Sequence, residues 1–501
     1  MRATTTTTVG RRVLVGLAAL VALPAALLAA LLAVGLAARA WQTAGRDLAP
    51  WHTAALEEMS AAALDAADWP GWLAAEAAVF DALRERVTAR VAATPGHRVA
   101  ANRHFAGSPL HAPGFARDWN RSFVLEPEGG PPEGAAVLVH GLTDSPYSVR
   151  HLAEAYRARG FVAVAPRMPG HGTAPSGLVG ARWEAWAAAT RLAVREARRR
   201  AGGDRPLHLV GYSNGGALAL MAALDAVEDP GRSPRAARVV LVSPMVGVTE
   251  FARLAGLPAR LLPAFAGAAW LEVLPEHDPF KYNSFPAEAA RQSWRLSSAV
   301  RDRLARLARG GRLGDMPPVL AFQSVADATV SAPAVVSALF ERLPANGSEL
   351  VLFDVNRDAR LGPLLRPEAA ALAGALVPPA PRAWRLTLVA NRAGGGAEAE
   401  ERTEPAGAAD PLPPRPLGLA WPREVFSLSH VALPFPVSDG LYGLDPDPAE
   451  DFGARLGALA VASRGERGVL ALGADALLRL RSNPFFPYLA GRVAEGLPPP
   501  R

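Results

Sequence analysis

Ser213 stands at a sharp transition in the sequence. The apolar run 207–210 indicates a buried strand, and an Ala/Leu-rich helical pattern begins directly after Gly215. Between them, Gly211-Tyr-Ser-Asn-Gly215 forms a G-x-S-x-G turn, which holds a serine hydroxyl out above a sheet. A side chain at either glycine would collide with neighbouring backbone, and the amides of the following helix favour negative charge here. We therefore predict that Ser213 is a nucleophile; a tight turn without chemistry is the alternative.

A serine hydroxyl is a weak nucleophile until a general base takes its proton. In chains with this kind of turn, an acid and then a histidine follow the serine. Of the ten histidines, only His277 and His430 lie after Ser213, and His430 directly follows a predicted strand at 424–429. We predict that His430 is the base, whereas His277 falls in a predicted cap and would line a pocket.

The histidine needs a carboxylate that holds it in one tautomer and stabilises its cation. Asp327 stands four residues past the predicted strand 318–323, in a position to reach the carboxyl ends of the strands. Asp354 ends another predicted strand and is the alternative. We expect Asp327 to orient His430.

A fourth component would stabilise the oxyanion that forms when a carbonyl is attacked. Val137 to Leu142 is a strand that opens into a tight turn at His140-Gly141. The backbone N–H groups of Leu142 and Asn214 would converge on the carbonyl oxygen, and losing one such donor typically costs on the order of 10²–10³ in rate. The ring of His140 is expected to fix its loop by hydrogen bonding.

Strand-like and helix-like stretches alternate from about residue 119. Strands are predicted at 122–125, 135–139, 161–165, 207–210, 238–242, 318–323, 350–354, 384–389 and 424–429, and helices at 147–159, 182–200, from the elbow to 227, 332–343 and 484–495. Continuous apolar strands that alternate with helices indicate an α/β fold, a mainly parallel sheet covered on both faces. Reactive groups then gather at the carboxyl ends of the strands.

Breaks in this alternation mark further parts of the chain. Residues 247–316 hold many leucines but no clear strand, so we expect a helical cap between a first core part, 119–246, and a second, 317–501. Residues 393–418 are rich in Gly, Glu and Pro and are expected to form a mobile loop.

The first 118 residues differ in character from the rest. A short tail, 1–12, carries three arginines, and residues 13–38 contain no charged side chain. About 20 apolar residues suffice to cross a bilayer, so we predict a transmembrane helix at 13–38, with a cleaved signal as the alternative. The arginines before the span favour a cytoplasmic N-terminus and an extracytoplasmic, or periplasmic, catalytic domain. Residues 39–118 are expected to form a helical stalk or extension that packs on the main domain.

Composition excludes several classes of function. Cysteine is absent, so there is no disulfide framework and no thiolate site. The net charge of +6 comes almost entirely from arginines interleaved with acidic residues, which does not indicate a nucleic-acid partner. No metal-binding or nucleotide-binding motif is present, so neither a metal nor a cofactor is expected. The oligomeric state stays open.

Together these residues resemble a known family. His140-Gly141, Gly170-His171-Gly172, the 211–215 turn, Asp327 and His430 resemble the α/β-hydrolase fold, and the 211–216 string is similar to the serine aminopeptidase/monoacylglycerol lipase group. The resemblance implies a catalytic triad, amide donors that form an oxyanion hole, and a structural turn at 170–172.

Two departures from the family stand out. An insertion is expected at about 345–420, because the helix after the acid and the histidine lie unusually far apart. The first 118 residues have no counterpart in soluble members.

The predicted function is a membrane-anchored serine hydrolase that cleaves carboxylic esters through an acyl-enzyme. An apolar cap and an anchor favour a small-molecule or lipid ester, monoacylglycerol-like, and a bilayer as partner. A peptidase or amidase on the same triad is the alternative, and a non-catalytic anchored binding protein is the alternative of another class.

Overall fold

A computed structural model gives the arrangement of the chain. It describes residues 34, 35, 38, 47–229, 231, 233–248, 250–261, 266–358, 362–394, 396–457, 464–466, 469, 470 and 479–500. The predicted transmembrane segment, 13–38, falls almost wholly outside these residues. Within the described part of the chain, no helix is both long enough and apolar enough to cross a membrane.

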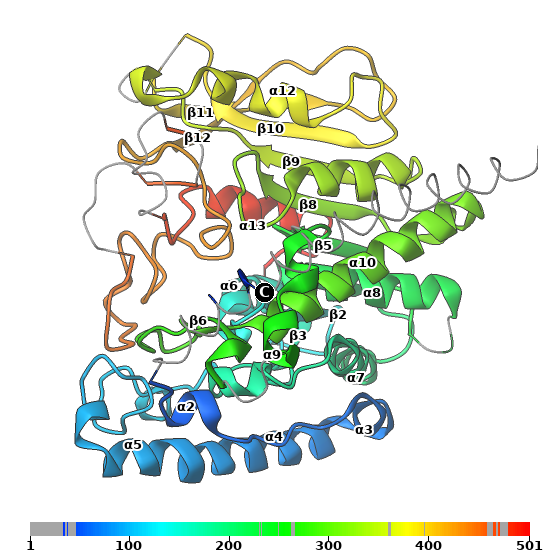
Figure 1. The fold of residues 1–501 in the computed structure, drawn as a ribbon. Coiled ribbons are helices and arrows are strands. Elements are labelled where there is room, and N and C mark those ends of the chain that lie inside the picture. Colours follow the sequence, from blue (N-terminus) through cyan, green and yellow to red (C-terminus); the bar gives the residue numbers. More distant parts are fainter. Residues whose placement is uncertain are drawn as a thin grey trace, which may run out of the picture.

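A sheet of ten strands forms the centre of the molecule (Figure 1). Its order is β1-β3-β2-β4-β5-β8-β9-β10-β11-β12. The seven strands from β3 to β10 are parallel, and β1, β11 and β12 are antiparallel additions at the two edges. The bounds are β1 (Phe123–Leu125), β2 (Gly134–Val139), β3 (Phe161–Ala165), β4 (Leu207–Tyr212), β5 (Arg238–Val242), β8 (Val319–Ser324), β9 (Glu349–Phe353), β10 (Arg385–Asn391), β11 (Glu398–Glu404) and β12 (Arg415–Ala420).

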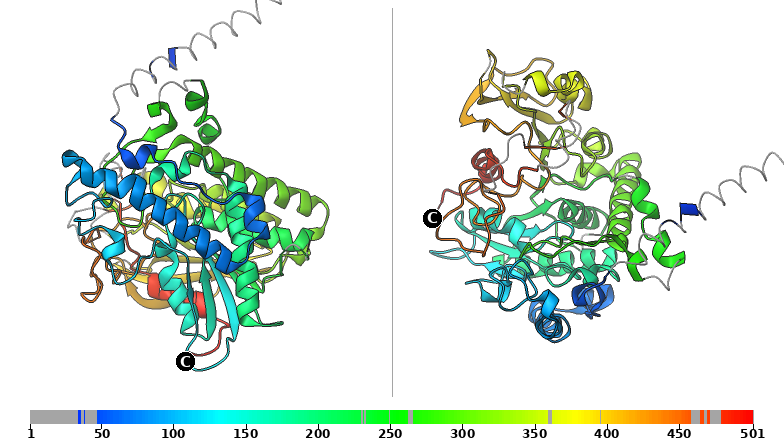
Figure 2. Two further views of the ribbon diagram at one scale, coloured as in Figure 1. Left: turned by 90° about the horizontal axis from the view of Figure 1, so that it is seen from below. Right: turned by 60° about the vertical axis from the view of Figure 1, so that its left-hand side comes forward.

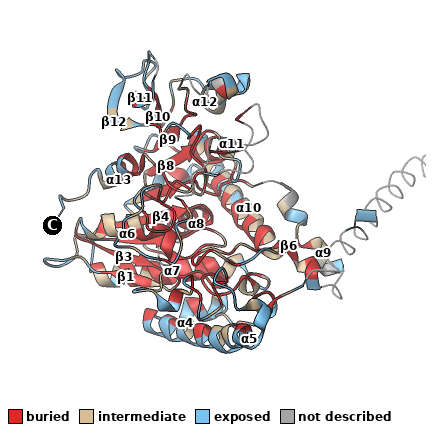
Figure 3. Cartoon of the chain, turned by 90° about the vertical axis from the view of Figure 1, so that its left-hand side faces the viewer, coloured by how far each residue is buried: buried red, intermediate tan, exposed pale blue. Residues whose placement is uncertain are grey.

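Helices cover both faces of this sheet, which confirms the predicted layering. One face carries α7 (Trp183–Ala201), α8 (Asn214–Glu228) and α10 (Ala287–Arg309), and the other carries α6 (Arg150–Arg157) and α13 (Phe486–Ala494). Successive side chains of a strand point to opposite faces, so Leu209 packs with the first group and Val210 with the second. Figure 3 shows the buried residues concentrated in the sheet and in α8, while β12 at the edge is largely exposed.

The segment before the sheet packs on α7. It contains α2 (Pro50–Thr53), α3 (Ala61–Ala66), α4 (Trp69–Leu83), a π-helical turn (Arg84–Thr88) and α5 (Ala89–Ala93). Figures 1 and 2 show these helices at the end of the molecule opposite β10–β12. Leu64 and Trp72 are fully buried in the same hydrophobic cluster as α7 and α8, so this segment belongs to the main core.

A buried arginine ties this segment to the sheet. Arg167 follows β3 and has no exposed surface; its guanidinium contacts Glu58 at 2.7 Å and Glu76 at 3.1 Å. Glu76 also accepts hydrogen bonds from the amide and the hydroxyl of Ser122, which precedes β1. Two carboxylates from the N-terminal segment therefore neutralise one cation of the sheet domain.

The prediction of a mobile loop at 393–418 is wrong, because β11 and most of β12 lie there. The glutamates that suggested a solvated loop are paired within the sheet. Glu401 accepts hydrogen bonds from Arg415 of β12 at 2.8 Å and from the hydroxyl of Tyr488. Glu400 accepts one from Arg402 at 2.9 Å. Ion pairing thus lets a glutamate-rich segment continue the sheet.

The predicted strand at 424–429 is not formed. Residue 425 makes an isolated bridge with 464, and no strand includes this segment. The edge of β10 that it would pair with is occupied by β11. Residues 424–429 therefore form an irregular segment that leads into His430, although their composition is that of a strand.

The cap was predicted without strands, and this too needs correction. Besides α9 (Leu257–Leu261) and the long α10, it contains a short hairpin of β6 (Trp270–Glu272) and β7 (Phe285–Pro286). His52 of α2 bonds Ser284 at 3.0 Å and its ring meets Trp270 edge-on. The N-terminal segment thus contacts both the core and the cap.

We expect Arg167→Ala to destabilise the protein by about 3–5 kcal/mol, because it leaves the buried Glu76 and the partly buried Glu58 without their cation. The matched control is Arg84→Ala, whose ion pair with Asp81 is exposed, and it should cost less than about 1 kcal/mol. Urea unfolding of both variants measures the difference. Equal free energies of unfolding for the two variants would contradict the claim that the ion pairs of Arg167 stabilise the contact between the N-terminal segment and the sheet.

Candidate active site

Ser213 forms the turn between β4 and α8. Its backbone lies at φ 55° and ψ −117°, a conformation that costs free energy for any residue with a side chain. Three hydrogen bonds hold the turn: the Ser213 amide donates to Val242, and its carbonyl accepts from Gly216 and Met245, at 2.9–3.0 Å. The surrounding sheet therefore fixes the strained turn that the sequence predicted.

The two glycines of the turn are required by the backbone that surrounds them. A Cβ at Gly215 would lie 2.0 Å from the carbonyl oxygen of Val139, and one at Gly211 would lie 2.3 Å from that of Gly215. Neither clash can be relieved by rotating a side chain, because the atoms it meets are backbone. The β4–α8 crossing leaves room only for glycine on both sides of the serine.

Asp327 and His430 meet at the carboxyl end of β8. Asp327 Oδ2 lies 2.9 Å from His430 Nδ1, and its Oδ1 accepts the amides of Thr329 and Val330 at 2.8 and 3.0 Å. Burial penalises the charged carboxylate, but the His430 ring and the two amides outweigh it, so the pKa of Asp327 lies below its usual value. The carboxylate can hold His430 with its proton on Nδ1 and leave Nε2 free as a base.

Among the described residues, neither Asp354, the alternative acid, nor His277, the other histidine after Ser213, contacts the Asp327–His430 pair. Asp354 is engaged by the guanidinium of Arg357 at 2.9 Å. His277 turns its ring nitrogen to the carbonyl of Pro275 and is absent from the described lining of the cavity that holds His430. The prediction that His277 lines the pocket is therefore wrong, because its ring is hydrogen-bonded within its own loop.

The segment that carries His430 is fixed by residues that the motifs did not reveal. Glu466, which is fully buried, accepts the His430 amide at 2.7 Å, and its own amide donates to Ser427. Burial raises the pKa of Glu466, while Arg479 opposes this effect. Since Glu466 lies 36 residues after His430 in a stretch without a motif, only the fold identifies it.

Ser213 and His430 line one cavity of about 500 Å³ beneath the cap. Apolar side chains form much of its wall: Met245 from the core, and Val248, Ala252, Ala255, Leu271, Phe285 and Ala290 from the cap. The His430 ring lies against Tyr212, with ring centroids 5.4 Å apart. Among the described residues no hydrogen bond joins Ser213 to His430; such bonds commonly tighten only when substrate binds.

The loop at His140–Leu142, predicted to supply an oxyanion donor, lies against the serine. A Cβ at Gly141 would come within 3.3 Å of the Ser213 Cβ, so the loop and the elbow touch. In the described contacts, neither the Leu142 nor the Asn214 amide donates to a backbone carbonyl. Both N–H groups are thus available to an oxyanion beside Ser213, as two donors from different elements.

Buried histidines support these loops. His140 Nε2 accepts the Met168 amide at 3.0 Å, so the ring proton resides on Nδ1, which donates to the Gly141 carbonyl at 2.9 Å. Burial lowers the pKa of His140 well below its usual value and lowers that of His171 to about 3. Both glycines of Gly170-His171-Gly172 have positive φ, as a tight turn requires. These rings are neutral hydrogen-bonding groups.

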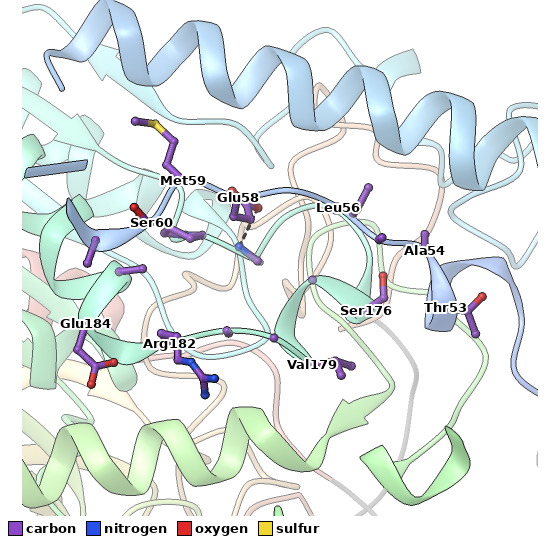
Figure 4. A pocket seen from close by; sticks show the side chains of 18 of the residues that line it. Thr53, Ala54, Leu56, Glu58, Met59, Ser60, Ser176, Val179, Arg182 and Glu184 are labelled. Carbon is purple, nitrogen blue, oxygen red and sulfur yellow. Dashed lines mark hydrogen bonds between the residues drawn. The ribbon is translucent and has the colours of Figure 1, made fainter. Parts of the chain in front are cut away.

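A larger cavity, of about 790 Å³, lies elsewhere, between residues 52–61 and 169–185 (Figure 4). Glu58, labelled in Figure 4, lines this cavity and accepts a hydrogen bond from the Gly170 amide at 2.8 Å. Ser213, Asp327 and His430 are not among its lining residues. The larger cavity is therefore not the one that holds Ser213 and His430. In the part of the chain that the structure describes, no group of three or more His, Asp or Glu side chains is placed to hold a metal ion.

Comparison with known proteins agrees with this arrangement. Residues 130–356, which run from the strand before the oxyanion loop to just past β9, match the profile of the family described as serine aminopeptidase, S33. Over this range the chain has the α/β-hydrolase fold. This confirms the fold that the sequence resembled and covers the serine and Asp327; His430 lies outside the matched range.

The individual proteins to which the chain is similar are distant from it in sequence. The thermostable monoacylglycerol lipase of Bacillus sp. (strain H-257) is 26% identical over 225 residues, which make up 45% of this chain and 81% of that protein. Among solved structures, the monoacylglycerol lipase of Paleococcus ferrophilus is 20% identical, with a TM-score of 0.35, over 51% of this chain and 97% of its own. A soluble variant of the Saccharomyces cerevisiae monoglyceride lipase is 12% identical, with a TM-score of 0.36, over 46% and 81%.

Gly215→Ala should abolish soluble, folded protein or leave it without activity, because the new methyl group would overlap the Val139 carbonyl. Gly491→Ala is the matched control: a Cβ there meets nothing within 4 Å, and alanine is the better helix former in α13. Thermal unfolding and ester hydrolysis of the two variants give the comparison. A Gly215→Ala protein as stable and active as the control would show that the elbow is not held as described.

Proposed function

We propose that this chain is a serine hydrolase that cleaves carboxylic esters through an acyl-enzyme. The observation that carries the proposal is the bond between Asp327 and His430 at a cavity that also holds Ser213. A strained serine, an oriented imidazole and free amides are the parts that acyl transfer requires. The comparisons support a hydrolase; the roles of the individual residues are our proposal.

The proposed reaction has two stages, acylation of the serine and hydrolysis of the acyl-enzyme. Ser213 Oγ attacks the ester carbonyl carbon while its proton passes to His430 Nε2, and Asp327 stabilises the imidazolium through Nδ1–H. The Leu142 and Asn214 amides hold the negative oxygen of the tetrahedral intermediate. His430 then gives its proton to the departing alcohol, and the acyl group stays on Ser213. A water molecule, deprotonated by His430, releases the acid and restores the hydroxyl.

The cavity favours an acyl ester over a peptide. Its wall under the cap is mostly aliphatic, which suits an acyl chain. An aminopeptidase must bind the α-ammonium group of its substrate, for which a carboxylate is the natural partner. In the described lining the one side chain with a fixed charge is Lys281, and that charge has the wrong sign. Monoacylglycerol-type esters fit this environment, and two of the similar proteins reported above are named monoacylglycerol lipases.

We further propose that residues 13–38 anchor the enzyme in a bilayer, with a cytoplasmic N-terminus and an extracytoplasmic catalytic domain. The support is the length of this segment without a charged residue and the arginines that precede it. An anchor would hold the cavity near lipid esters, which are poorly soluble in water.

Purified protein should hydrolyse short p-nitrophenyl esters, and Ser213→Ala should lower kcat by roughly 10⁶. Asp327→Asn should lower kcat by about 10⁴, because the histidine loses its tautomer, whereas Asp354→Asn should retain activity since Asp354 bonds Arg357 instead. Steady-state kinetics with amides of the same acyl groups, run in parallel, tests the peptidase alternative. Wild-type activity no higher than that of Ser213→Ala would leave only a non-catalytic binding protein.

In cells that express the full chain, a membrane-impermeant fluorophosphonate should label Ser213 without permeabilisation of the cytoplasmic membrane. A variant that lacks residues 13–38 should move to the soluble fraction while keeping its labelling in extracts. Ser213→Ala gives the background. Labelling that requires permeabilisation would overturn the proposed orientation, and a full chain found in the soluble fraction would overturn the anchor.

A further inference from the structure

Lys281 is the only lysine in the chain; all other basic side chains among its 53 Lys and Arg residues are arginines. It lies in the cap hairpin between β6 and β7 and lines the cavity that holds Ser213 and His430. An ammonium group differs from a guanidinium in being compact and in carrying three donors on a flexible stem. It can therefore reach into a small cavity without filling it.

The backbone around Lys281 is clamped next to the oxyanion loop. Arg103 donates to the Lys281 carbonyl at 3.0 Å, and the Lys281 amide donates to Asp278 at 3.1 Å. The amide of the following residue, Tyr282, donates to the Thr143 carbonyl at 2.8 Å. Since Thr143 directly follows Leu142, the lysine is held at a set place relative to the proposed oxyanion hole.

Among the described contacts, the ammonium group of Lys281 makes no hydrogen bond. Its polar neighbour among the described contacts is Asp144 Oδ2, 3.4 Å away, in a geometry that does not form a hydrogen bond. The rings of Tyr212 and Phe435 lie 5.6 and 5.9 Å from Nζ, so its other neighbours are aromatic faces. In a cavity whose wall is mostly apolar, such donors gain most from an oxygen on a bound molecule.

The surrounding charges decide what kind of oxygen this is. Asp144 is fully buried, and its carboxylate already balances the ammonium charge; burial raises the pKa of Asp144, while Lys281 opposes that effect. Asp278 adds a second buried carboxylate near the same place, and Arg481 balances its charge at 3.9 Å. An anionic head group would therefore meet no net positive charge. A neutral oxygen, such as a hydroxyl, can accept from Nζ without facing repulsion.

We propose that Lys281, held by Asp144, binds the hydroxyl oxygens of the alcohol part of the ester, and that it thereby selects neutral polyol esters such as monoacylglycerols. This inference rests on the proposed ester hydrolysis at Ser213. The acyl chain then lies along the aliphatic cap residues and the polyol lies beside Thr143 and Lys281. Lys281 acts by binding the substrate and takes no part in moving protons.

The test compares two substrates with the same acyl chain, a monoacylglycerol and a methyl ester without free hydroxyls. In Lys281→Met, the ratio of kcat/KM for the monoacylglycerol to that for the methyl ester should fall about tenfold or more, as expected for the loss of a hydrogen bond from a charged donor. Lys281→Met leaves Asp144 buried without its cation, so the double variant Asp144→Asn/Lys281→Met is measured as well and should show the same fall. His277→Ala, in the same hairpin but outside the cavity, should leave the ratio unchanged.

The possible results separate the two proposals. If the wild type hydrolyses neither ester, the proposed function fails. If it hydrolyses both and the ratio is unchanged in both lysine variants, only the polyol site is refuted. An equal fall for both esters would assign Lys281 to general stabilisation of the site and would also refute it. A monoacylglycerol phosphate hydrolysed better than the monoacylglycerol by the wild type would overturn the preference for a neutral head group.

Discussion

The hydrogen bond between Asp327 and His430 joins two segments that are 103 residues apart in the chain. Asp327 leaves the end of a central parallel strand, where the amides of Thr329 and Val330 fix its carboxylate. His430 has no strand to support it and depends on Glu466 and its neighbours for its position. The site is therefore rigid on the side of the acid and is assembled from loops on the side of the base.

The serine is held by a different physical constraint. At the β4–α8 crossing there is no room for a Cβ on either side, so the backbone cannot relax into an ordinary turn. The unfavourable conformation of Ser213 persists because the sheet and the following helix determine it completely. The N-terminal segment extends the same core through Arg167 and buried aromatic side chains, so it stabilises the sheet on which the elbow is built.

Much of the core could be predicted because its signals are local. The apolar strands, the helix after Ser213 and the glycines at 211 and 215 depend on neighbours within a few residues, and the structure places them where they were expected. The pairing of Asp327 with His430 could be proposed only because few histidines follow the serine, and the structure now brings these two side chains together. Their catalytic roles stay predictions.

The parts that could not be predicted depend on distant partners. The segment 424–429 has the composition of a strand, but the sheet edge it would need is occupied by β11. The segment 393–418 has the composition of a loop, but Arg415 neutralises Glu401, Tyr488 donates a hydrogen bond to it, and β11 forms. Neither Glu466 nor Lys281 belongs to a motif, so their positions follow only from the fold.

The most direct measurement is a crystal structure of the protein inhibited with a fluorophosphonate. Our account predicts phosphorus bonded to Ser213 Oγ, with the phosphoryl oxygen within about 3 Å of the amides of Leu142 and Asn214. The Nε2 atom of His430 should lie beside Ser213 Oγ, with Asp327 still bonded to Nδ1. A phosphonate on another residue, or a His430 ring too far from Ser213 to exchange a proton, would contradict the account.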